Sequence, residues 1–192
     1  SPTNIRVLVG DDTEGLEARL IARDSELDLA WVQIKDVGDR RFPYINLGNA
    51  TDARPGQALI SIRRMGKFLD RVAVLIESRV AGIAKKPREL YVPTLPLSSG
   101  LGLPVFTADG KVLGVAVMQM PSDEDDEQGA AAMLSRMSAM QEMMYGFVLP
   151  AEDVIEATQR ARQIAATQPA ADNDDAATAA PGSAAGAGDD ED

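Results

Sequence analysis

Short runs of β-branched and apolar residues, each stopped by a turn signal, constrain the fold of this chain more than any other feature. The runs cover residues 5–9, 17–22, 29–34, 58–62, 72–76, 78–84, 103–106, 112–117 and 146–149. Asp109-Gly110, between two of these runs, is a hairpin signal because glycine accepts the positive φ of a tight turn. Many short strands at this spacing predict an all-β sandwich or barrel, not a βαβ fold.

Helix is predicted only toward the C-terminus. Pro150 and the acids Glu152 and Asp153 suit the free N–H groups and the dipole of a first helical turn, which predicts a C-terminal helix over 151–166. Four methionines, at positions 133, 137, 140 and 144, lie on one stripe of a second helical segment within an insertion at 121–144. That stripe is interpreted as core packing, with an adaptable partner surface as the alternative.

The last segment, residues 167–192, contains seven acids and no Lys, Arg, aromatic or long aliphatic residue. It has too little apolar surface to offset its ordering entropy and is predicted to be a disordered acidic tail. A solubilising terminus or linker is the preferred interpretation, and an interaction tail is the alternative. The chain begins Ser-Pro without a Met, which indicates a processed or cut chain.

Composition excludes several classes of function. The 192 residues carry a formal net charge of −11, which argues against nonspecific nucleic-acid binding. There is no Cys and no His, so the chain offers no thiolate, no imidazole base and no Cys- or His-ligated metal. No apolar run approaches the roughly 20 residues that span a bilayer.

Three charged groups were weighed as sites. The acidic run 123–127 lacks the ordered ligand spacing of a calcium loop and is interpreted as solvated. The pairs Asp11-Asp12 and Asp24/Asp28 could serve glycoside chemistry, but aromatics are only 4% of the chain. The stretch 85–88, with Arg63, Arg64 and Lys67, is interpreted as one basic patch, which is a solvated loop or, as the alternative, a site for an acidic peptide or the tail.

Four segments, in order, resemble the trypsin-fold serine proteases, most closely the HtrA/DegP-like group. They are residues 18–30 with an Asp-Leu-Ala signature, 45–50 followed by 54–58, 101–106 with 109–115, and 146–150. The resemblance implies two six-stranded Greek-key β-barrels with a cleft between them. It assigns residues 1–50 to the C-terminal part of an incomplete first barrel and 51–150 to the second barrel.

The resemblance also places the catalytic positions. Asp28 matches the triad aspartate, and the nucleophile position, three residues before Pro104, is Leu101, which has no nucleophilic atom. The backbone N–H groups of Ser99 and Leu101 match the oxyanion hole. Ser98 or Ser99 as a substitute would stand roughly 6 to 10 Å away in an extended segment. The family's His would lie about thirty residues before Asp28, outside the chain.

The resulting hypothesis is a non-catalytic HtrA-like module that binds a peptide or protein partner or acts structurally. It predicts no nucleic-acid partner, no membrane span, no metal and no cofactor, and it leaves homo-oligomerisation open. The resemblance implies a periplasmic or secreted location. The alternative is a fragment of an active serine endopeptidase whose His lies upstream of Ser1.

Overall fold

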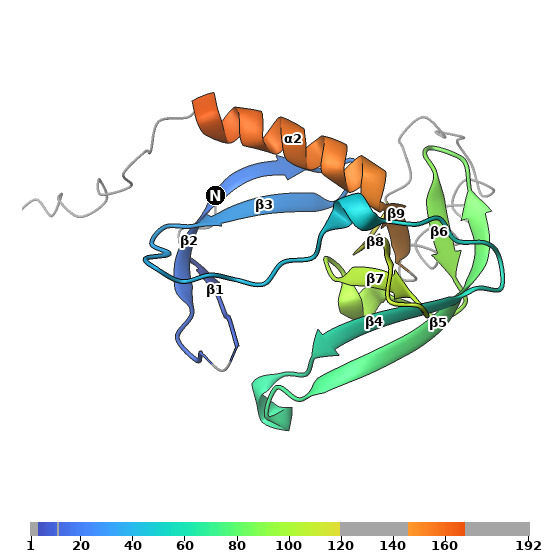
Figure 1. Cartoon of the computed structure of the whole chain (residues 1–192), viewed down its shortest axis with the longest axis horizontal. Coiled ribbons are helices and arrows are strands. Elements are labelled where there is room, and N and C mark those ends of the chain that lie inside the picture. Colours follow the sequence, from blue (N-terminus) through green and yellow to red (C-terminus); the bar gives the residue numbers. More distant parts are fainter. Residues whose placement is uncertain (1–3, 11, 120–145, 168–192) are drawn as a thin grey trace, which may run out of the picture.

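The computed structural model describes residues 4–10, 12–119 and 146–167. A three-stranded antiparallel sheet is followed by a closed six-stranded barrel in the order β4-β5-β6-β9-β8-β7, and a helix then packs across both (Figure 1). The sheet contains β1 (Ile5–Val7), β2 (Leu16–Asp24) and β3 (Leu29–Ile34). The barrel contains β4 (Ala58–Arg64), β5 (Ala73–Ala84), β6 (Leu90–Pro93), β7 (Pro104–Thr107), β8 (Val112–Val117) and β9 (Phe147–Pro150). Three 3-10 turns, η1 (Leu47–Asn49), η2 (Lys67–Leu69) and η3 (Ser98–Gly100), lie between strands, and α2 (Ala151–Thr167) closes the described chain.

The all-β class with a C-terminal helix is confirmed. The Asp109-Gly110 hairpin joins β7 to β8, with Gly110 at a φ of 78° and its N–H donating to the Thr107 carbonyl at 2.9 Å. The helix begins at Ala151, directly after Pro150 ends β9. Among the residues that the structure describes, the first unit is a three-stranded sheet, and the assignment of residues 1–50 to part of a first barrel stays a prediction.

Two strand predictions differ from the structure. The separate runs at 72–76 and 78–84 form one twelve-residue strand, β5, because the charged Glu77 between them falls on an outward-facing position of the alternating pattern. Strand β6 was not predicted, since Pro93 within a four-residue run weakens the strand signal. Its tertiary pairing with β5 and β9 nevertheless closes the barrel.

The barrel interior is filled by inward-facing apolar side chains from all six strands. The cluster contains Ala53, Leu59, Val80, Tyr91, Leu97, Val105, Leu113, Ala116 and Val148. Burial of this apolar surface is the dominant stabilising term for such a barrel.

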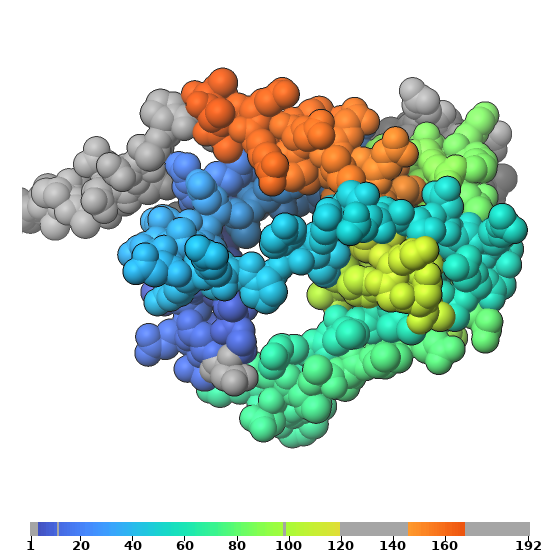
Figure 2. Space-filling model, in the orientation of Figure 1, coloured from blue at the N-terminus to red at the C-terminus, as the bar shows by residue number. Residues whose placement is uncertain are grey.

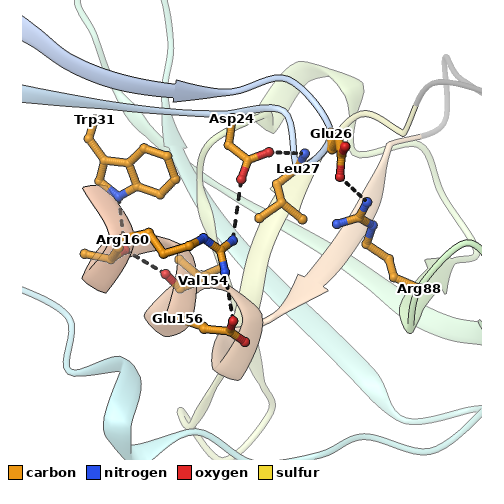
Figure 3. A network of polar contacts seen from close by, with 9 residues as sticks. Asp24, Glu26, Leu27, Trp31, Arg88, Val154, Glu156 and Arg160 are labelled. Carbon is orange, nitrogen blue, oxygen red and sulfur yellow. Dashed lines mark hydrogen bonds and ion pairs between the residues drawn. The ribbon is translucent and has the colours of Figure 1, made fainter. Parts of the chain in front are cut away.

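A second apolar cluster joins the sheet, the barrel and the helix. It contains Leu27, Leu90, Val117, Leu149, Val154 and Ala157, with Leu29 and Trp31 packed against it. The Trp31 Nε1–H donates to Thr158 Oγ1 at 3.0 Å, and that hydroxyl donates to the Val154 carbonyl at 2.7 Å (Figure 3). The turn between β2 and β3 is thereby fixed against the barrel, which positions Asp28.

Several sequence predictions lie outside the described residues. They are Asp11, the acidic run 123–127, the Met-rich insertion 121–144 and the acidic tail after Thr167. Within residues 4–10, 12–119 and 146–167, no helix has the length and apolar character needed to cross a membrane. Over the same residues, no group of three or more carboxylates is arranged to hold a metal ion.

Candidate functional site

Leu101 follows η3 in the loop that leads into β7. Its backbone, at φ −57° and ψ 137°, leaves the 3-10 turn, and Gly102 then takes a φ of 79° that favours glycine. The loop is held to β8 by two backbone bonds, from Gly102 N–H to the Ala116 carbonyl at 2.7 Å and from Ala116 N–H to the Leu103 carbonyl at 2.9 Å. Leu101 is 36% exposed, so part of this aliphatic residue is accessible at the protein surface.

Asp28 occupies the turn between β2 and β3 with a φ of 54°. Aspartate tolerates this left-handed conformation better than most residues because its short polar side chain bonds nearby backbone groups. Here the carboxylate bonds outside its own turn: Oδ2 accepts a hydrogen bond at 2.9 Å from the N–H of Met118, which directly follows β8. Asp28 is therefore a contact between the sheet and the barrel.

The structure brings these two predicted positions to the same strand. The Leu101 loop is bonded to β8 at Ala116, and Asp28 is bonded two residues further on, at Met118. Two residues of a strand span roughly 6.6 Å. The two positions predicted as triad aspartate and nucleophile are thus attached near the same end of β8.

The chemistry available at this end is limited by the side chains present. A leucine offers no lone pair for attack, and no His exists anywhere in the chain to remove a proton. Ser61 Oγ lies beneath the loop but donates to the Pro104 carbonyl at 3.0 Å and is 3% exposed. It fixes the start of β7, so it is a structural serine.

The predicted oxyanion pair falls within and just after η3. Gly100 N–H donates to the Leu97 carbonyl at 2.7 Å, which begins the 3-10 winding. The Ser99 carbonyl accepts from Arg63 Nη1 at 3.5 Å, which attaches the turn to β4.

The carboxylates of Asp24 and Asp28 have different partners and do not form a catalytic pair. Asp24 accepts from Leu27 N–H at 3.0 Å and lies 3.6 Å from Arg160 of α2, while Glu26 lies 3.7 Å from Arg88 (Figure 3). Together with Asp28, these acids attach one turn to α2, to the segment before β6 and to β8. The turn is a docking element of the fold.

A pocket of about 390 Å³ lies at the start of α2 and was not predicted. Four carboxylates line it, those of Asp52, Glu89, Glu152 and Asp153. Burial raises the pKa of Asp153, with nearby Arg88 acting in the opposite direction. Burial also raises the pKa of Tyr91, whose hydroxyl donates to Asp52 Oδ1 at 3.5 Å. The four acids come from three separate segments, so no local sequence signal could have gathered them.

The single basic patch expected from the sequence is two separate groups. Arg64 pairs with Ala73 at one end of β5, and Lys85 follows Ala84 at the other end. A twelve-residue strand spans roughly 40 Å, so the 85–88 cations cannot share a ligand with those at 63–67. Lys85 is paired with Glu89, and Arg88 is paired with Glu26.

Comparison with known proteins agrees with this architecture. The closed six-stranded barrel and the C-terminal helix match the trypsin-like fold. Residues 1–115 match the family described as trypsin-like peptidase domain, and the chain belongs to that family.

Curated relatives belong to the HtrA group. The chain is 28% identical over 162 residues to the serine protease Do-like HtrA of Bacillus subtilis, covering 79% of this chain and 32% of that protein. It is 31% identical over 123 residues to a probable periplasmic serine endoprotease, DegP-like, of Rickettsia prowazekii, covering 58% of this chain and 22% of that protein. The chain thus spans less than a third of the length of these relatives.

Solved structures show the same fold. Deg5 aligns with a TM-score of 0.52 at 20% identity, covering 76% of this chain and 62% of that one. The MamO protease domain from Magnetospirillum magneticum aligns with a TM-score of 0.50 at 15% identity, covering 77% and 71%. The chain therefore has the trypsin-like fold, and the curated proteins that it resembles in sequence belong to the HtrA group.

Proposed function

We propose that this chain is a non-catalytic HtrA-like module that binds a peptide or protein segment beside the 98–103 loop. The observation that supports this proposal is Leu101, an aliphatic residue at the position where the family's mechanism needs a hydroxyl. The nearby Ser61 is committed to the Pro104 carbonyl and is buried, so it does not replace the missing group.

Binding is favoured over a purely structural role by the surface around the loop. Leu101 is an exposed large apolar residue, and Leu103, two residues further on in the same loop, is half-buried. Exposed apolar side chains on a loop held rigid by backbone bonds are typical of recognition surfaces. An extended segment with apolar side chains is the ligand class that such a surface suits.

The binding test uses fluorescein-labelled unfolded casein and fluorescence anisotropy. Leu101→Asp is expected to weaken binding about tenfold, because an isobutyl group is removed from the contact and a charge must be desolvated. Leu75→Asp is the matched control, since Leu75 is an exposed leucine on β5, where it pairs with Ile62 of β4. Equal affinity of both variants and the parent would refute a binding site at Leu101.

A second candidate is a piece of an active serine endopeptidase whose His lies upstream of Ser1. It is favoured by the presence of an aspartate, Asp28, at the triad position and by relatives that are named serine endoproteases. Casein hydrolysis and labelling by a serine-directed phosphonate, measured on the full-length natural protein, separate the two candidates. Labelling that disappears in a Ser98→Ala/Ser99→Ala variant would establish the second candidate and end the first.

We also propose a periplasmic or secreted location. The support is that the DegP-like relatives are named periplasmic. Cell fractionation of the natural protein with a cytoplasmic marker tests this proposal, and co-fractionation with that marker contradicts it. Light scattering of the same sample decides whether the protein forms homo-oligomers.

A further inference from the structure

The end of the β4–β5 hairpin carries two pockets that share three cationic residues. One pocket, of about 490 Å³, is lined by Arg64, Lys67 and Arg71 together with Leu8, Gly10, Met65 and Gly66. The other, of about 360 Å³, is lined by the same three cations with Thr13 and Asp70. The β1–β2 end of the sheet therefore forms one wall and the hairpin forms the other, as Figure 2 shows for the blue and the teal-to-green segments.

The charge of this hairpin end is opposite to that of the whole protein. Residues 63–71 hold four cations, Arg63, Arg64, Lys67 and Arg71, and one carboxylate, Asp70, whereas the chain as a whole has a net charge of −11. Charges farther apart than the Debye length of about 8 Å at physiological ionic strength are largely screened. The hairpin residues alone therefore present three more positive than negative charges to a ligand, and the Asp12 carboxylate on the facing loop offsets part of that excess.

Arg71, which lines both pockets, and the neighbouring loop at Asp12 are held in place by the fold. Arg71 Nη1 donates to the Asp12 carbonyl at 3.1 Å, which ties the hairpin to the β1–β2 loop. The Asp12 carboxylate accepts from the N–H groups of Glu14 and Gly15, at 2.9 and 3.2 Å. These backbone hydrogen bonds lower the pKa of Asp12, and the bond from Glu14 N–H has the larger effect.

Beside the cations the same hairpin end exposes large apolar side chains. Phe68 is 93% exposed in η2, and Leu69 and Val72 are also exposed. In Figure 1 this turn lies at the free end of the hairpin, at the edge of the molecule opposite α2. An almost fully exposed phenylalanine on a projecting turn gains nothing for the isolated fold, because its apolar surface stays in water.

We propose that the β4–β5 hairpin end docks on an anionic phospholipid surface, with lipid phosphates against Arg64, Lys67 and Arg71 and Phe68 inserted among the acyl chains. Basic residues flanking exposed aromatic and aliphatic side chains are the pattern by which proteins bind membrane interfaces without spanning them. This inference does not depend on the proposed function, since the hairpin end is built from residues other than those of the Leu101 loop.

A lipid surface fits this patch better than an acidic peptide does. Phe68 projects from a convex turn, whereas peptide anchors insert into pockets of a concave partner site. A bilayer interface yields around a projecting side chain and offers many phosphates at once, which matches two adjoining cationic pockets. The cations thus complement the headgroups while the aromatic ring complements the acyl region.

The experiment is co-sedimentation of the full chain with vesicles made of equal parts phosphatidylglycerol and phosphatidylcholine, compared with pure phosphatidylcholine. Binding is expected only to the anionic vesicles and is expected to fall as salt rises. Lys67→Gln should reduce the partition coefficient about fivefold. Phe68→Ser should reduce it about tenfold, because the inserted ring is lost.

Two matched controls keep the test specific. Lys86→Gln removes an exposed lysine from the other basic group, and Leu95→Ser removes an exposed apolar side chain elsewhere; both are expected to bind like the parent. Circular dichroism confirms that each variant is folded. A Phe68→Trp variant should show blue-shifted emission with anionic vesicles, relative to the parent containing Trp31 alone.

Several outcomes would overturn the inference. One is failure of the parent to sediment with anionic vesicles, and another is sedimentation that neither Lys67→Gln nor Phe68→Ser weakens. A third is full displacement by inorganic phosphate with no effect of Phe68→Ser, which would reveal a site for free phosphate. A fourth is binding of a labelled acidic peptide together with no binding to vesicles, which would identify a protein partner instead.

Discussion

Replacement of Gly114 by alanine tests whether the close approach of β8 and β9 is what closes the barrel. A Cβ at Gly114 would lie 1.9 Å from the Leu149 carbonyl oxygen and 2.8 Å from its carbon, both of them backbone atoms that no rotamer change can move. Ordinary contact begins at 3.4 Å, so β9 would have to retreat by about 1.5 Å. Only glycine fits this strand position, since the partner backbone occupies the space that a side chain would need.

The cost can be worked out from what that retreat disturbs. It stretches the β8–β9 ladder around the Gly114↔Pro150 and Val115↔Leu149 pairs and loosens Leu149, which is completely buried. One or two weakened ladder bonds cost about 1 kcal/mol each, and partial loss of the packing of a buried leucine costs about 1 to 2 kcal/mol. The free energy of unfolding should therefore fall by about 3 kcal/mol, a large fraction of the roughly 5 to 15 kcal/mol typical of domains.

Urea unfolding followed by circular dichroism measures this loss. With a slope of about 2 kcal/mol per molar urea, the midpoint should fall by roughly 1.5 M. Gly82→Ala is the matched control, because Gly82 also lies in a barrel strand but has no atom within 4 Å of an added Cβ. It should change stability by less than about 1 kcal/mol. If the two variants unfold at the same urea concentration, the close approach of β8 and β9 does not limit the barrel and the reasoning is wrong.

Three further predictions concern the candidate site and the β7–β8 hairpin. Asp28→Asn should keep the free energy of unfolding within about 0.5 kcal/mol of the parent, because Asn tolerates the φ of 54° and its amide oxygen still accepts from Met118 N–H. Asp28→Ala should lower the free energy of unfolding by about 1 to 2 kcal/mol in the same urea assay. A large loss with Asn would show that the charge itself is needed. Leu101→Ser should leave casein hydrolysis and phosphonate labelling of this chain at background, since no His is present to accept the proton, and labelling above background would contradict that account. Thr107→Val should raise the pKa of Asp109 in a carboxyl NMR titration, because the Thr107 hydroxyl, 2.6 Å away, is the main cause of its lowered value. Because the pKa of Asp109 is lowered in the folded state, its ionised carboxylate stabilises the fold at pH values above the usual Asp pKa, and this stabilisation is lost as the pH falls through the folded-state pKa. The free energy of unfolding of Thr107→Val should therefore depend less on pH in this acidic range. An unchanged pH dependence would refute the role of Thr107.

The strands could be predicted because their signals are local. Runs such as 112–117 are apolar throughout, and they end at turn residues whose conformation is set by one or two positions, as at Gly110. Strand β6 escaped prediction since its signal is short and contains Pro93, and only pairing with β5 and β9 makes it a strand. Local propensity decides strands with strong patterns, and tertiary contact decides the weak ones.

The positions of the candidate site residues could be predicted from the sequence, but the contacts that join them to distant segments could not. The spacing from Leu101 to Pro104 is local, and so is the aspartate signature at Asp28, so both positions could be found by resemblance. The bond from Met118 N–H to Asp28 joins residues 90 positions apart. The pairing of Asp24 with Arg160 and the splitting of the basic residues by β5 also depend on how distant segments meet. No pattern within a short window contains that information.

The loop at Leu101 shows that the local fold does not depend on the side chain at the predicted nucleophile position. The bonds that attach this loop to the barrel join Gly102 and Leu103 to Ala116 and the Arg63 side chain to the Ser99 carbonyl, and none uses the side chain at position 101. The carboxylate at position 28 retains a role for a related reason, since its bond to Met118 joins the sheet to β8 whether or not an imidazole is present. An isobutyl group in place of a hydroxyl at this exposed position therefore costs the fold little, although a leucine has no nucleophilic atom. Selection for stability alone would keep Gly102, Gly114 and Asp28 and would leave position 101 free to change.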